Sequence, residues 1–125
     1  MLKADSGIVT SGSAMEIVKR KEKDALVVSL KGRLDAVTSP VLEKDLTELM
    51  AGAENTLVVD LGDLDYISSA GLRVLLATTK KLKGKQGKLL LASLKNVVKE
   101  VFEISGFSAI IPIYESVDAA LSSLG

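Results

Sequence analysis

The sequence predicts an α/β fold: a small, mixed, mostly parallel β-sheet flanked by helices, with an antiparallel hairpin at its N-terminal edge. Short apolar segments rich in branched residues occur at 56–61 and 88–92, and such segments are typical of strands buried on both faces of a sheet. Segments with helical spacing of apolar residues alternate with them, which indicates parallel strands joined by crossover helices. A charged turn at 21–24 separates two further strand-like segments.

The individual elements follow from local signals. The hairpin strands are expected at 16–19 and 25–30, and the first helix at 39–50, with Ser39 as its cap, Pro40 in its first turn and Gly52 beyond its end. A second helix follows Ser68 and Ser69 and ends before Gly84. A third helix is expected to be capped by Asn96 and to end at Gly106, and a last one to be capped by Ser116. A short strand at 109–113 contains Pro112, which places it at a sheet edge.

The length of 125 residues suits one compact domain. Residues 1–14 are small and polar, with little apolar surface to offset the cost of ordering, so we expect a flexible N-terminal tail followed by a domain over 15–125.

The composition excludes several functional classes. Sixteen acidic residues balance 16 basic ones, so no overall field draws the chain to nucleic acid. Histidine and cysteine are absent, which removes the imidazole of most hydrolytic triads and metal sites together with all thiol chemistry. No apolar run approaches the roughly 20 residues of a membrane span. We therefore expect a cytoplasmic protein that is neither a typical hydrolase nor a metalloenzyme and that has no metal or cofactor.

Two adjacent hydroxyls, Ser68 and Ser69, mark the junction between a strand and a helix. Either side chain can cap the helix by accepting a bond from a free N–H of its first turn. One cap is sufficient, however, and the same N–H groups and the helix dipole favour a phosphate there. The residues alone leave both interpretations open.

Three motifs together resemble the STAS domain family of anti-sigma factor antagonists. They are Gly32-Arg33-Leu34-Asp35, Val58-Val59-Asp60-Leu61 and Tyr66-Ile67-Ser68-Ser69-Ala70-Gly71-Leu72, and the resemblance runs from about Glu16 to Leu124. It implies that Ser69 is the phosphorylated serine. Ser68 occupies the position that is often Asp in the family and is a weaker candidate acceptor. Asp35, Ile67, Ser68, Ser69, Gly71 and Leu72 are the expected partner-binding residues.

The resemblance also implies a function. The unphosphorylated form would bind an anti-sigma factor that is also a serine kinase and so free the sigma factor. Phosphorylation of Ser69 would abolish this binding, and a type 2C phosphatase would restore it. The alternative is a phosphorylation-independent docking subunit of a stress-sensing or lipid-transport complex, with Ser69 only a cap.

Two other features suggest different chemistry. Asp60, near the end of a predicted strand, invites comparison with the phosphorylated aspartate of receiver domains, but Lys31-Gly32-Arg33 offers no acidic pair to bind magnesium. Gly84-Lys85 and the neighbouring Lys80, Lys81, Lys83 and Lys88 resemble a phosphate loop, but the G-x-x-x-x-G-K-[ST] motif is missing. We interpret these lysines as a solvated helix end.

Overall fold

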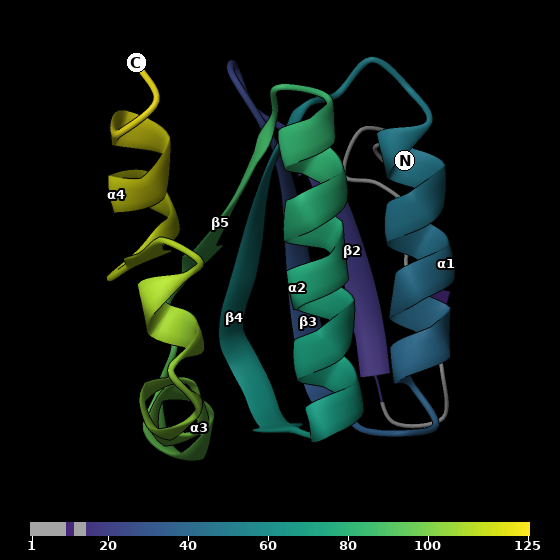
Figure 1. Ribbon diagram of the computed structural model, residues 1–125, viewed down its shortest axis with the longest axis vertical. Coiled ribbons are helices and arrows are strands. Elements are labelled where there is room, and N and C mark those ends of the chain that lie inside the picture. Colours follow the sequence, from purple (N-terminus) through teal and green to yellow (C-terminus); the bar gives the residue numbers. More distant parts are fainter. Residues whose placement is uncertain (1–9, 12–14) are drawn as a thin grey trace, which may run out of the picture.

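The computed structural model describes residues 10–11 and 15–125, which form one β-sheet with helices on both faces (Figure 1). Within these residues six strands lie in the order β1-β2-β3-β4-β5-β6, which is also their order along the chain. The pairs β1-β2 and β2-β3 are antiparallel, and the other three pairs are parallel. The predicted mixed, mostly parallel sheet with an antiparallel N-terminal edge is confirmed. Of the expected tail, 1–14, Thr10–Ser11 form β1 and the remainder lies outside the described residues.

The N-terminal hairpin consists of β2 (Met15–Lys21) and β3 (Leu26–Leu34), which are longer than the predicted strands. Their antiparallel register runs from Met15 opposite Gly32 to Lys21 opposite Leu26. Along β3 the residues in the main core alternate with residues of the opposite face, the pattern of a strand in a layered sheet.

Helix α1 (Ser39–Met50) connects β3 to β4 and begins one residue earlier than its predicted cap implies. The N-cap is Thr38, whereas Ser39 is the first helical residue and its hydroxyl donates to the carbonyl of Asp35 at 2.6 Å. The prediction that Ser39 is the cap is therefore wrong. The preceding loop explains the difference, because Thr38 and Ser39 are both used to hold Asp35.

Strand β4 (Thr56–Ile67) continues six residues beyond the predicted end at Leu61. Its parallel pairing with β3 carries two register shifts, one after the Ser29–Asp60 pair and one after the Gly32–Leu64 pair. Gly32 at the second shift has a φ of 106°, a conformation that favours glycine. These bulges interrupt the alternation of apolar and polar residues, so the strand beyond Leu61 could not be recognised from its pattern.

Helix α2 (Ser69–Gly84) follows β4 directly and leads to β5 (Lys88–Ala92), both as predicted. Helix α3 (Asn96–Ser105) ends at Gly106, which has a φ of 82°, but its N-cap is Lys95 and makes no side-chain bond, so the prediction that Asn96 is the cap is wrong. The short edge strand predicted at 109–113 is present, but its bounds were wrong. The chain instead forms a 3₁₀ helix, η2 (Phe107–Ala109), and the short edge strand β6 (Ile113–Tyr114). Helix α4 (Val117–Ser122) is capped by Ser116 as predicted.

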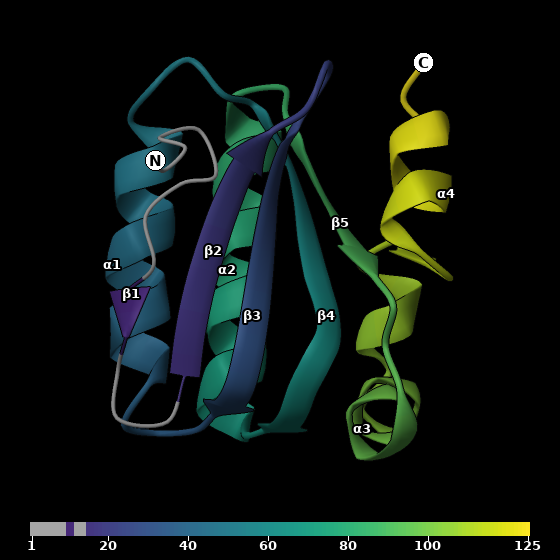
Figure 2. The same ribbon diagram turned by 180° about the vertical axis from the view of Figure 1, so that it is seen from behind.

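The helices cover the two faces of the sheet unequally. Helices α1 and α2 lie side by side on one face, and α3 packs at the lower end of the same layer (Figure 1). The main core between these helices and the sheet is built from apolar side chains that include Leu34, Leu46, Leu61, Leu75 and Phe102. Helix α4 covers a smaller cluster on the other face, which includes Val27 of β3 and Val58 of β4, whereas β2 carries no helix on that face (Figure 2). In the part of the chain that the structure describes, no helix has both the length and the apolar character needed to cross a membrane.

Gly71 lets the first turn of α2 lie directly on the sheet. A Cβ at this position would lie 2.7 Å from Cγ of Leu34 and 3.1 Å from Cγ1 of Ile67, closer than carbon atoms tolerate. Leu34 and Ile67 are paired in the β3–β4 register, so Gly71 rests across the ends of both strands. Any larger residue would lift the helix start away from them.

Replacing Gly71 by Ala should therefore destabilise the protein. Overpacking against the buried Leu34 costs roughly 1–3 kcal/mol, which exceeds the gain of up to about 1 kcal/mol in helix propensity. Gly84 at the other end of α2 provides the matched control, because a Cβ there meets nothing within 4 Å. Denaturant unfolding should show lower stability for Gly71→Ala and equal or higher stability for Gly84→Ala. Equal stability of Gly71→Ala and wild type would contradict this close contact.

Candidate functional site

The candidate site lies at the carboxyl ends of β3 and β4, where parallel strands commonly present functional loops. The last paired residues of these strands are Leu34 and Ile67, and the N–H of Ser68 donates to the carbonyl of Leu34 at 2.9 Å. Asp35 and Ser68, which follow these paired residues, therefore lie at the same edge of the sheet. The structure thus brings together the two loops that the sequence singled out.

The two serines have separate roles in the structure. Ser68 is the N-cap of α2, and its Oγ accepts a hydrogen bond from the N–H of Gly71 at 3.2 Å. Ser69 is the first residue of the helix, is exposed, and its hydroxyl makes no hydrogen bond within residues 15–125. The cap is therefore Ser68, and the Ser69 hydroxyl is exposed without a hydrogen bond to residues 15–125.

The other predicted contact residues divide by burial. Ile67, Gly71 and Leu72 are buried, and Ile67 is 3% and Leu72 8% exposed. They form the base on which the first turn of α2 rests. Asp35 and Ser68 are partly exposed, so they and Ser69 are the predicted residues whose polar groups reach the surface.

The loop after β3 is ordered by the carboxylate of Asp35. Its Oδ1 accepts bonds from the N–H groups of Val37 and Thr38, both at 3.0 Å. In return, the hydroxyl of Thr38 accepts from the N–H of Asp35 and donates to the carbonyl of Arg33. The bond from the Thr38 N–H is the largest cause that lowers the pKa of Asp35, and the bond from Val37 and the charge of Arg33 act in the same direction. The charged form of Asp35 thus holds this loop in place.

Sequence reasoning missed three surface residues beside the two loops. Val37 is 71% exposed and places an apolar side chain on the surface of the Asp35 loop. The guanidinium of Arg33 lies 4.2 Å from the ring centroid of Tyr66, which covers the sheet face behind the junction. Arg73 follows Ser69 by four residues, one helical turn, and this spacing was the signal available in the sequence.

A groove of about 370 Å³ runs between the first turns of α1 and α2, next to Ser69. Its walls are small and apolar, with Pro40 from α1 and Ala70 and Val74 from α2. One charge lines each side, Glu43 on α1 and Arg73 on α2. A protein docked at Ser69 would therefore find a recess that accepts side chains rather than a flat surface.

The arrangement gives no support to phosphoryl transfer at Asp60. This residue lies in the middle of β4, and its carboxylate accepts bonds from the Ser29 hydroxyl at 3.3 Å and the Gly62 N–H at 3.0 Å. Among the described residues, no group of three acidic side chains could hold a metal ion. Asp60 is engaged in structural bonds within the sheet.

The lowered pKa of Asp35 predicts a pH-dependent contribution to stability. The contribution should be complete above the ordinary carboxyl pKa of about 3.9 and be lost as the pH falls through the lower value in the folded protein. Asp35→Asn should therefore unfold at lower denaturant concentration than wild type at pH 7, with a difference that shrinks below about pH 4. Asp63→Asn is the control, because Asp63 is exposed and makes no hydrogen bond within residues 15–125. A difference between wild type and Asp35→Asn that persists unchanged at pH 2 would contradict this role.

Comparisons with known proteins agree with this geometry. The family model of the STAS domain matches residues 16–120. The chain is 43% identical to BtrV of Bordetella bronchiseptica, named as an anti-sigma factor antagonist, over 87% of this chain and 94% of that protein. It is 31% identical to the anti-sigma-B factor antagonist of Listeria monocytogenes, over 77% of this chain and 84% of the relative. A crystal structure of an anti-sigma factor antagonist from Mycobacterium paratuberculosis superposes with a TM-score of 0.83 at 27% identity, covering 91% of this chain and 97% of the other. The chain therefore belongs to the STAS domain family of anti-sigma factor antagonists.

Proposed function

We propose that this protein is a phosphorylation-controlled antagonist of an anti-sigma factor. In its unmodified form it binds an anti-sigma factor that is also a serine kinase, and the sigma factor is released. Phosphorylation of Ser69 by that kinase abolishes binding, and a type 2C phosphatase restores the binding form. The protein itself acts as a ligand and substrate, not as a catalyst.

The observation that carries this proposal is that only one of the two serines, Ser68, is used as the helix cap. Because Ser68 supplies the cap, the hydroxyl of Ser69 remains exposed and free of intramolecular bonds in the described residues. A kinase can reach such a hydroxyl without unfolding the helix. The same argument favours Ser69 over Ser68 as the acceptor, because modification of Ser68 would disturb the bond to Gly71.

The fold accommodates a phosphate at Ser69. The N–H groups of Ser69 and Ala70 have no acceptor within the described residues, and the N-terminal end of a helix favours negative charge. Arg73, one turn further along α2, provides a cation at the i+4 spacing. The phosphate would therefore leave the folded protein intact.

The phosphate destabilises the complex with the partner rather than the folded protein. A phosphoserine carries nearly two negative charges, and an uncompensated charge at an interface costs several kcal/mol. Releasing a partner about a thousandfold requires roughly 4 kcal/mol. The exposed Val37 and the groove beside Ser69 are the surfaces that a docked partner would cover. One phosphate at Ser69 is therefore sufficient to prevent docking.

Substitutions at the two serines test the proposal. The anti-sigma factor kinase of the same genome should add one phosphate to wild type, and mass spectrometry of peptides should locate it at Ser69. Calorimetry should show that Ser69→Ala binds this kinase like wild type, whereas Ser69→Glu binds about a thousandfold more weakly. Ser68→Ala is the matched control: it should lose about 1 kcal/mol of stability with its cap and still be phosphorylated.

Two results would contradict the proposal. Phosphate located on Ser68 would transfer the acceptor role to the capping residue. Undiminished binding by Ser69→Glu would instead identify the chain as a docking subunit of a stress-sensing or lipid-transport complex whose contacts do not depend on phosphorylation.

A further inference from the structure

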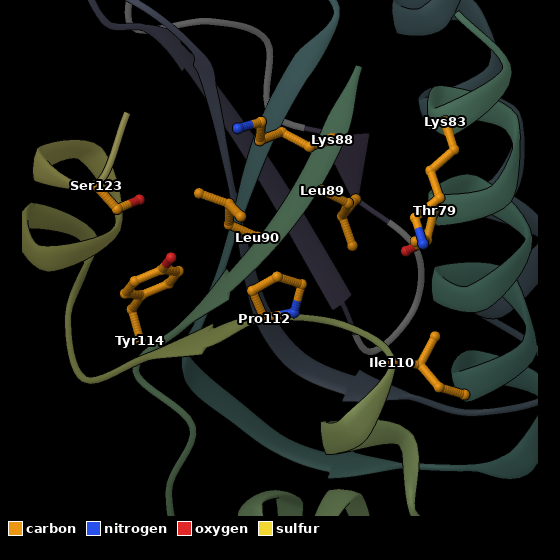
Figure 3. A pocket seen from close by; sticks show the side chains of 9 residues that line it. All are labelled: Thr79, Lys83, Lys88, Leu89, Leu90, Ile110, Pro112, Tyr114 and Ser123. Atoms are coloured by element: carbon orange, nitrogen blue, oxygen red, sulfur yellow. The ribbon is translucent and has the colours of Figure 1, made fainter. Parts of the chain in front are cut away.

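A notch opens in the sheet edge at the end of α2 opposite Ser69. It has a volume of about 320 Å³ and lies along the start of β5, above Pro112 (Figure 3). Thr79 and Lys83 of α2 border it on one side of β5, and Tyr114 and Ser123 on the other (Figure 3). Neither the serine site nor the groove between α1 and α2 includes these residues.

The notch exists because β6 pairs with only part of β5. The parallel ladder consists of Leu91 opposite Ile113 and Ala92 opposite Tyr114, with the N–H of Leu91 donating to the carbonyl of Pro112. One step earlier, the N–H that would reach the carbonyl of Leu89 belongs to Pro112, which has none. The chain before Pro112 turns away through η2, where the N–H of Ile110 bonds within its own turn to Phe107. The ladder therefore ends at Leu91.

Leu89 consequently presents an unpaired peptide group to the notch. The N–H of Lys88 donates to Asn55 next to β4, whereas those of Leu91 and Ser93 point to the β6 side. Because alternate residues of a strand bond to opposite neighbours, the N–H and C=O of Leu89 point to the β6 side as well. Neither group has a hydrogen-bond partner within residues 15–125, although Leu89 is only 1% exposed. An unpaired donor and acceptor on one residue match the edge of an arriving strand. Because Leu89 is almost fully covered, such a strand must displace the side chains that lie over this peptide group.

The charges around the notch select the kind of strand. Successive residues of an added strand point to opposite sheet faces. On one face such a strand would meet Lys83 from α2, and on the other Lys88, whose side chain lies on the same side as Leu90 (Figure 3). Both lysines are exposed and neither forms an ion pair within the described residues. The floor between them is apolar, formed by Leu89, Leu90, Ile110 and Pro112.

We propose that this notch binds a short extended segment of a partner protein that carries adjacent acidic residues, added to β5 as an edge strand. Main-chain bonds to Leu89 provide the pairing, and two consecutive acidic side chains reach Lys83 and Lys88 on opposite faces. The segment has room for about three residues before Pro112 blocks its path. Binding here is independent of the proposed function, because the notch lies about 21 Å along α2 from Ser69, from residue 69 to residue 83.

The probe for the test is a fluorescein-labelled peptide amide, Val-Glu-Glu-Val-Val, titrated with the full chain at low salt. Fluorescence polarisation should show binding that weakens about tenfold or more with Lys83→Glu or Lys88→Glu. Lys81→Glu, which changes the net charge equally on the same helix but does not line the notch, should change the affinity less than about twofold. NMR should show the Leu89 amide shifted by the probe and its hydrogen exchange slowed about tenfold. Ser69→Glu should bind the probe like wild type.

Several outcomes would overturn the proposal. If Val-Lys-Lys-Val-Val bound as tightly as the probe, the charge of the peptide would have no role. If the probe bound equally well with N-methyl groups on both glutamate amides, main-chain pairing would have no role. An equal loss of affinity in Lys81→Glu would reduce the effect to general attraction by the lysines. A shift of Leu89 by sodium octanoate but not by the peptide would make the notch a site for small amphipathic anions. Circular dichroism of the lysine variants, all at exposed positions, excludes misfolding as the cause of lost binding.

Discussion

The position of the serine junction depends on the close contact between the first turn of α2 and the ends of β3 and β4. Gly71 rests on Leu34 and Ile67 with no space for a Cβ, and the N–H of Ser68 is bonded to the carbonyl of Leu34. These contacts fix the height and the rotation of the helix start. With that rotation, the Ser68 side chain turns back toward Gly71 as the cap, and the Ser69 side chain is left at the surface. The chemistry available to the two hydroxyls therefore follows from packing beneath them.

Sequence patterns predicted the parts of the fold that packing or local chemistry dictates by itself. The strands at 56–61 and 88–92 and the helix after Ser69 were correct because their apolar residues face a continuous core. The extension of β4 to Ile67 was missed because its outer residues face a sheet surface without a helix, where bulges interrupt the alternation. Ser39 and Asn96 are suitable caps by residue type, but both are the first residues of their helices. At Ser39 the reason is that Thr38 and Ser39 both bond to Asp35.

The candidate site was predictable in its location but not in its detail. Two adjacent serines before Gly71 satisfy the cap pattern equally well in sequence, and only the bond from the Gly71 N–H to Ser68 shows which of them is the cap. Ile67 and Leu72 were expected at the surface because they flank the serines, yet in three dimensions they face the core. The notch at Leu89 depends on how Pro112 meets β5 across the sheet edge, a relation between residues far apart in sequence.

The rigidity of α2 also determines how the two ends of the molecule can communicate. Charges more than about 8 Å apart are largely screened at physiological ionic strength, and the proposed phosphate and the notch lysines are separated by about 21 Å of helix. No hinge intervenes, because α2 is a continuous helix whose inner face is buried along its length. Coupling between the two ends would require this packed helix to move as a body, against the contact at Gly71. If both proposals hold, a phosphate at Ser69 would change one interface and leave the other constant, so that a partner at the β5 edge would stay attached in both chemical states.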